Sequence, residues 1–224
     1  METKKAEEGF LRERHVLLGF VFLGLQLFTI GRNMSSDYFS FFWYCDFVPG
    51  LFALLFFLKK EQAVKGLVNI GLFAQLGYIL ILAAHLLFNI TLFGFLINFP
   101  LTFWYVSASI IVHCSTLVAF LATLRIQPKR SALGYSLLFL VGIYAVVLAM
   151  TERVAEPWGN YNFIYDLGVL NSLGVYTELW VLFAFALVAI PTHFFQLGIF
   201  KFLQDKKTQH EGLGRREFFT PSSR

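Results

Sequence analysis

The sequence predicts an all-α membrane protein, a bundle of six transmembrane helices with both termini in the cytoplasm. Apolar residues make up 57% of the 224 residues and charged residues only 14%, a balance too apolar for a soluble domain of this size. The apolar residues gather in six runs, each close to the roughly 20 residues that a helix needs to cross a bilayer. Lys and Arg gather in alternate connectors between these runs, which indicates an even number of spans.

The first three spans are defined by the residues that bound them. The first, about 15–31, follows the mixed charges of residues 1–14, and no small-x-small cleavage motif follows it, so we expect an uncleaved span. The second, 41–58, is an apolar run of 18 residues that stops at two lysines. The third, about 65–88, ends at an uncharged connector that begins with Asn89.

The last three spans end or begin at basic residues. The fourth, about 101–124, stops at Arg125. The fifth, about 131–150, starts directly after a Pro-Lys-Arg sequence, and the sixth, about 175–200, ends at Lys201. Basic residues at the ends of apolar runs are typical of helices that stop at a membrane surface.

The distribution of charge predicts the orientation of the bundle. Sixteen of the 18 Lys and Arg residues fall on one side of the predicted membrane, and only Arg32 and Arg153 fall on the other. The positive-inside rule therefore places both termini in the cytoplasm of a multi-pass protein of the cell membrane. We assign the spans to one transmembrane domain, 1–204, and expect the charged tail, 205–224, to be a disordered cytoplasmic segment.

Polar residues of four spans are expected at one depth. Counted at about 1.5 Å per residue from the basic residue at the end of each span, Cys45 and Asp46 lie about 20 Å up, and His113 and Gln26 about 18 Å. Gln75 comes out at about 15 Å. An acidic residue inside a membrane span is costly, so it is normally partnered and marks a working site.

Helical periodicity places polar residues of the third and fourth spans on facing stripes. Gln75 and Tyr78 share one face of the third span, and Ser109 and His113 share one face of the fourth. We expect these two stripes to face one another. Packing of small polar residues between helices explains Ser109 equally well, but an imidazole in lipid needs a partner.

A thiol and an imidazole at one depth contain the parts for nucleophilic acyl transfer. His113 would take the proton of Cys45 and later return it to the leaving group. Neighbouring residues on a helix point about 100° apart, so we expect Asp46 to bind a connector residue instead, either Tyr161, Asn162 or Arg153. The resulting site would lie in the outer half of the bilayer.

Other polar residues are weaker candidates. His85 is expected at the outer interface, where it is solvated or gates the site, and Glu178 either reaches water or lines the entrance. We interpret His193, two residues after Pro191, as a donor that satisfies a helix kink, and Cys114 as a packing residue. No His-x-x-x-His or Glu-x-x-His pair occurs, so no metal is predicted, and no motif indicates a cofactor.

Several short segments together resemble the YwaF-like integral membrane family. They are Tyr-Cys-Asp at 44–46, Leu-Lys-Lys-Glu-Gln at 58–62, Asn-Ile-Gly-Leu at 69–72, the single His113 of the fourth span, and Gly-Asn-Tyr-Asn-Phe at 159–163. The resemblance covers about residues 41–166, and the chain differs from the family pattern by a longer interval between its Cys and its His.

The resemblance implies a chemistry and a role for each residue. The family includes a vertebrate acyltransferase that remodels ether phospholipids through a Cys and a His. By position, this implies Cys45 as the acyl acceptor and His113 as its base, with Asp46, Tyr161 and Asn162 as supporting groups.

Three functions remain open from the sequence. The first is an intramembrane enzyme that transfers or hydrolyses the acyl chain of a membrane lipid at Cys45. The second is a proton-coupled transporter, or a membrane protein that binds a small molecule, in which Asp46 and His113 act. The third is a structural membrane subunit. The expected partner is a membrane lipid and not a nucleic acid, because the basic residues lie at helix ends; the oligomeric state stays open.

Overall fold

The protein is all-α in the part of the chain that the structure describes. This computed structural model describes residues 2–36, 43–90, 102–153 and 176–217. The helices are α1 (Glu2–Ser36), α2 (Tyr44–Phe57), α3 (Glu61–Phe88), α4 (Phe103–His113), α5 (Ser115–Ala122), α6 (Arg130–Arg153), α7 (Tyr176–Ala184), the π-helix η5 (Phe185–Ala189) and α8 (Ile190–Glu217). Since α4 continues into α5, and α7 continues through η5 into α8, these segments form six helices within the described residues.

Five of these six helices are long and apolar enough to cross a membrane. They contain the stretches Glu13–Met34, Glu61–Phe88, Phe103–Ala122, Arg130–Ala149 and Thr177–Lys206. The second helix differs from the predicted span: α2 has 14 residues, or about 21 Å, less than the roughly 30 Å of a hydrocarbon core. Residues 41 and 42, with which the predicted span began, lie outside the described residues.

The distribution of side chains supports a membrane location. Large apolar residues point outward, among them Leu80, Leu138 and Leu187, which are 63 to 70% exposed. Polar residues instead lie inside the bundle, where Asn69 and Ser136 are fully buried. A surface this apolar is rare on a soluble monomer, whereas helices that face lipid require it.

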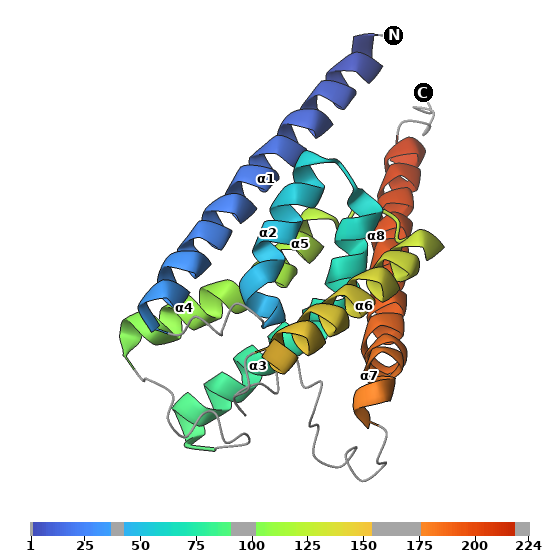
Figure 1. The fold of residues 1–224 in the computed structure, drawn as a ribbon. Helices are drawn as coiled ribbons and strands as arrows, with labels where there is room; N and C mark the ends of the chain where they lie inside the picture. The colour runs from blue at the N-terminus through green and yellow to red at the C-terminus, as the bar shows by residue number, and fades with distance from the viewer. Residues whose placement is uncertain (1, 37–42, 91–101, 154–175, 218–224) are drawn as a thin grey trace, which may run out of the picture.

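Helix α3 lies at the centre of the bundle and contacts α2, α5, α6 and α8. Aromatic packing joins α1 to α2: the ring of Phe22 stacks on Phe56 with 5.4 Å between centroids, and it meets Phe52 at 5.1 Å. Figure 1 shows the start of α1 and the end of α8 at the same end of the bundle. The side of the membrane on which they lie stays a prediction. Helix α8 continues through residues 205–217, which the sequence analysis assigned to the tail.

Gly66 sets the distance between α3 and α6. A Cβ atom at this position would lie 2.9 Å from the carbonyl oxygen of Ala132 and 3.1 Å from the backbone nitrogen of Ser136. These are backbone atoms of a helix, so they cannot rotate away. The absence of a side chain at Gly66 therefore lets the two helices approach closely.

Replacing Gly66 with Ala is expected to lower the free energy of unfolding by about 1 to 3 kcal/mol, because the added methyl group forces α3 and α6 apart. Reversible unfolding in mixed micelles, followed by tryptophan fluorescence, measures the change. The matched control is Gly134→Ala on α6, where a Cβ meets no atom within 4 Å, and stability should stay the same or rise slightly. Equal stabilities of the two variants would contradict the close contact.

Candidate functional site

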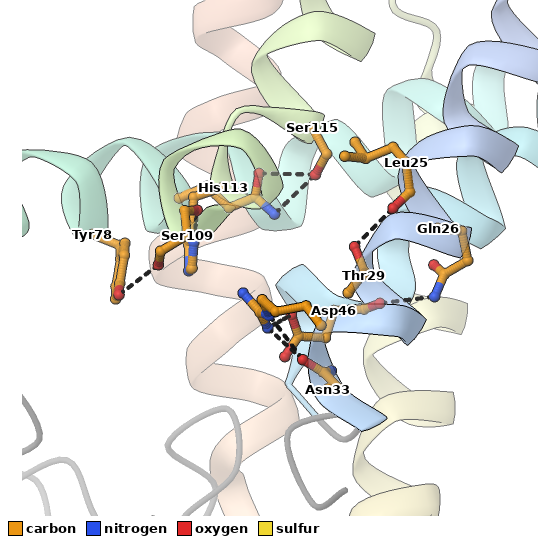
Figure 2. Close-up of polar contacts among 11 residues, drawn as sticks. Leu25, Gln26, Thr29, Asn33, Asp46, Tyr78, Ser109, His113 and Ser115 are labelled. Atoms are coloured by element: carbon orange, nitrogen blue, oxygen red, sulfur yellow. Dashed lines mark hydrogen bonds and ion pairs between the residues drawn. The ribbon is translucent and has the colours of Figure 1, made fainter. Parts of the chain in front are cut away.

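An ion pair buried in the bundle joins α1 to α2. Arg32 Nη2 lies 2.6 Å from Asp46 Oδ1, and the two side chains are only 11% and 3% exposed. The guanidinium also donates to Asn33 Oδ1 from Nε at 2.9 Å and from Nη2 at 2.7 Å. Arg32 therefore bonds both Asp46 and Asn33, and Figure 2 shows Asp46 beside Asn33. Asp46 is partnered inside the bundle, as expected, and Arg32 of the first helix is one such partner. The expected connector partners Tyr161, Asn162 and Arg153 stay predictions, because their side chains are not among those that the structure describes.

Gln26 of α1 positions the turn of α2 that carries Asp46. Its Nε2 donates to the carbonyl oxygen of Asp46 at 3.0 Å, and its Oε1 accepts from the backbone nitrogen of Gly50 at 2.7 Å. Asp46 and Gly50 lie four residues apart on α2, and Pro49 lies between them in the sequence. Proline has no backbone N–H, so it removes one helical hydrogen bond here. Gln26 thus supports the helix at the site of this disturbance and holds Asp46 in place.

His113 is held in a defined orientation and tautomer. Its Nδ1 lies 2.8 Å from the carbonyl oxygen of Ser109, one turn earlier on α4. Its ring stacks on Tyr78 of α3 with 3.7 Å between centroids and 8° between planes. Because a carbonyl oxygen only accepts, Nδ1 carries the proton and Nε2 keeps the lone pair. A neutral His113 in this tautomer has its free lone pair at Nε2.

The predicted facing of the third and fourth spans is confirmed. The hydroxyl groups of Tyr78 and Ser109 lie 3.0 Å apart, and Figure 2 shows Tyr78, Ser109 and His113 together. One turn away, Gln75 Oε1 accepts from the backbone nitrogen of Thr116 at 3.0 Å. Both contacts join α3 to the fourth span at the positions that helical periodicity indicated.

The fourth span is interrupted beside His113, although the sequence predicts one continuous helix over about residues 101–124. Helix α4 ends at His113 and α5 begins at Ser115, with Cys114 between them. The first turn of a helix has backbone N–H groups without partners, and Cys114 provides no side-chain cap. Gln75 of α3 supplies that cap through its bond to Thr116, and it also bonds the Ser115 hydroxyl at 3.3 Å.

Cys45 directly precedes Asp46 in the first turn of α2. The half-buried thiol interacts electrostatically with Asp46 and Arg32, and also with Tyr78. Arg32 acts in the same way on His113. No hydrogen bond joins the Cys45 sulfur to the His113 ring in the described part of the chain.

The remaining predicted site residues lie at the margins of this site or outside the described residues. His85 is half-buried near the end of α3, and Glu178 is exposed in the first turn of α7. Tyr161 and Asn162 lie outside the described residues, and nothing is described of the Arg153 side chain. Cys114 is half-buried at the helix break.

The hydrogen bond predicted for His193 in the last span is not formed. Its Nδ1 is buried and makes no hydrogen bond, so the predicted role of His193 is wrong. The neighbouring Thr192 donates to the carbonyl oxygen of Val188, one turn earlier, at 2.7 Å.

Arg32 and Asn33 were missed as site residues. Arg32 is one of only two basic residues on its side of the predicted membrane, which could have indicated a site residue. This position was used only to predict the orientation of the bundle. Among the described residues, no group of three or more His, Cys, Asp or Glu side chains is placed to hold a metal ion.

Comparisons of the chain with models of protein families, with curated proteins and with solved structures give no match. The resemblance to YwaF-like proteins is therefore not supported by a family match. The sequence and the structure together show a helical protein with five helices long and apolar enough to span a membrane, which fits a multi-pass membrane location.

Proposed function

We propose that the protein is a multi-pass membrane enzyme that transfers or hydrolyses the acyl chain of a membrane lipid, with Cys45 as nucleophile and His113 as general base. The observation that carries the proposal is the fixed orientation of His113. Its Nδ1 is bonded to the Ser109 carbonyl, which leaves Nε2 as the basic nitrogen, and Tyr78 holds the ring plane. A preorganised base is what activates a thiol.

The proposed reaction has two steps. In the first, His113 Nε2 takes the thiol proton while the sulfur attacks the ester carbonyl carbon of the lipid. The imidazolium then gives its proton to the departing alcohol, and a thioester forms on Cys45. In the second, His113 takes a proton from a hydroxyl group or from water, whose oxygen attacks the thioester carbonyl carbon. The acyl group passes to that oxygen as an ester or a free acid, the carbon–sulfur bond breaks, and the imidazolium returns its proton to the Cys45 sulfur. Catalytic hydrogen bonds often tighten only when substrate binds, which would close the contact between Cys45 and His113.

In this proposal, Arg32 stabilises the negative charge that develops on the substrate during the reaction. A tetrahedral intermediate carries negative charge on the former carbonyl oxygen, and cationic donors stabilise such charge. The Arg32 guanidinium lies within electrostatic reach of both Cys45 and His113. Its bonds to Asp46 and Asn33 fix its direction. The likeness of residues 44–46 to the Tyr-Cys-Asp segment of YwaF-like proteins points to the same chemistry.

The proposal predicts an acyl thioester on Cys45. The protein, reconstituted in nanodiscs with a phospholipid that bears an alkyne-tagged acyl chain, should carry the tag on Cys45 in peptide mass spectra, and neutral hydroxylamine should release it. Cys45→Ser should lose the hydroxylamine-sensitive tag. Cys114→Ser is the matched control and should keep it, because Cys114 lies at the break between α4 and α5. Equal tagging of Cys114, or an unchanged tag in Cys45→Ser, would refute the proposal.

The buried ion pair favours a second candidate, a proton-coupled transporter or a protein that binds a small polar molecule. Charged pairs inside membrane bundles frequently mark ion or substrate pathways, and Arg32 with Asp46 forms such a pair. The two candidates differ in which residue is essential. In a transporter, Cys45→Ser leaves solute or proton flux into vesicles intact, whereas Asp46→Asn abolishes it.

A further inference from the structure

A second polar cluster lies away from Cys45, where α3, α6 and α8 meet. Gln196 Nε2 donates to Asn69 Oδ1 at 2.6 Å, and Asn69 Nδ2 donates to Ser136 Oγ at 3.0 Å. The Ser136 hydroxyl donates in turn to the carbonyl oxygens of Gly66 and Ala132, at 3.0 and 2.9 Å. The carbonyl groups can only accept, so the Ser136 hydroxyl must donate to them and accept from Asn69. This fixes the donor and the acceptor in each of these hydrogen bonds.

This direction leaves a buried acceptor without a donor. Gln196 turns its amide nitrogen toward Asn69, so its Oε1 points the other way and has no hydrogen-bond partner. One turn earlier on α8, His193 Nδ1 also lacks a partner. The two residues are only 1% and 5% exposed. Buried polar atoms normally have partners, so two unsatisfied atoms on one turn indicate a site for another group.

A buried cation lies next to these atoms. Lys65 is 1% exposed, and its ammonium group makes no ion pair among the described residues. Glu61, the acid one turn before it, contacts His15 Nε2 at 3.2 Å. Lys65 interacts electrostatically with His193, and its Nζ lies 5.8 Å from the centre of the Phe120 ring. Glu61 acts on Lys65 electrostatically without forming an ion pair, so the buried ammonium has no contacting counter-charge among the described residues. A buried ammonium without such a contact is costly.

Aromatic rings connect this cation with the apolar surface. Phe120 lies 6.0 Å from Phe195, and Phe195 lies 5.2 Å from Phe73, measured between ring centroids. Phe120 is buried at 8% exposure, while Phe195 and Phe73 are 41% and 43% exposed on the face that lipid would cover. A row of three phenylalanine rings therefore extends from the apolar surface to Lys65.

The local helix geometry is also unusual. The π-helix η5 ends at Ala189, two residues before Pro191, and the residues of the cluster on α8 follow within two turns. A π-helical turn shifts the side chains that follow it and is frequent at functional sites.

We propose that this cluster binds the carboxylate of a long-chain fatty acid. The Lys65 ammonium donates to the carboxylate and, with another of its three protons, to Gln196 Oε1. His193 donates from Nδ1 to the second carboxylate oxygen. The alkyl chain lies along the three phenylalanine rings and leaves the bundle toward lipid. One ammonium and one imidazole suit a planar monoanion better than a phosphate, which needs more donors. This binding does not depend on chemistry at Cys45.

The test uses palmitic acid that carries a photoreactive diazirine and an alkyne, added to the full-length protein in nanodiscs. Cross-links should map to peptides that contain Phe120 or Phe195. Lys65→Met should reduce labelling about tenfold or more, the size expected for a lost charge-assisted hydrogen bond. Lys65→Arg should keep most of it. The matched control is Lys201→Met, which removes an exposed lysine of α8 and should leave labelling unchanged.

Two comparisons keep the test decisive even where Lys65→Met fails to fold. In the wild-type protein, the methyl ester of the same probe should label at least tenfold less than the acid, and unlabelled palmitate should displace the probe better than phosphatidic acid. Equal labelling by acid and ester, unchanged labelling of folded Lys65→Met, or stronger displacement by phosphatidic acid would overturn the proposal. Cys45→Ala should label normally, so a failure of the acyl-transfer proposal would not be mistaken for a failure of this one.

Discussion

Replacing Asp46 with Asn is expected to lower the free energy of unfolding by about 3 to 5 kcal/mol. The substitution keeps the shape of the side chain but leaves the Arg32 cation without its counter-charge inside the bundle, where the pair is held at 2.6 Å. Arg32 cannot lose its proton to escape this cost. Reversible unfolding in mixed micelles measures the change.

Two controls separate the ion pair from the loss of any carboxylate. Glu178→Gln removes an exposed acid of α7 and should change stability by no more than about 0.5 kcal/mol. The double variant Arg32→Met with Asp46→Leu removes both charges, so it should be less destabilised than Asp46→Asn alone. An Asp46→Asn variant within about 1 kcal/mol of the wild type would contradict a buried pair.

Replacing His113 with Ala is expected to slow acyl transfer by about 10² to 10⁴-fold, the usual contribution of a general base. The effect should fall on kcat, because the imidazole acts on the thiol proton and not on the lipid. The measurement is release of a fluorescent fatty acid from a phospholipid in nanodiscs, under single-turnover conditions. Tyr78→Phe is the matched control: it keeps the stacked ring and removes only the hydroxyl that contacts Ser109.

The control should keep its rate within about tenfold of the wild type, since one neutral hydrogen bond contributes about 1 kcal/mol. A His113→Ala protein that is folded and as active as Tyr78→Phe would exclude His113 as the base. Equal losses in both variants would instead assign the effect to the packing of α3 against α4.

Periodicity and hydropathy predict the parts of this fold that depend on single helices. The apolar runs gave the number of helices, because each run must cover its backbone with apolar side chains in lipid. The contact of Tyr78 with Ser109 and His113 was also predictable, since residues three and four apart share a helix face. These features need no knowledge of how the helices are arranged.

Features that depend on contacts between helices were not predictable. The break at Cys114 has no Gly or Pro to announce it, and it is stabilised by Gln75 from another helix. Arg32 was not expected to pair with Asp46, because it was counted only as a charge at the outer end of the first span. Helix α2 is shorter than the predicted span because hydropathy reports which residues are apolar and not where the helix begins and ends.

The hydrogen bonds of Gln26 and the ion pair of Arg32 all join α1 to the helix that follows it in the chain. Arg32 and Asp46 are only 14 positions apart, so both emerge from the ribosome before most of the bundle has been synthesised. A helical hairpin of α1 and α2 can therefore enter the bilayer with its acidic and basic groups already neutralised, and the later helices assemble around it.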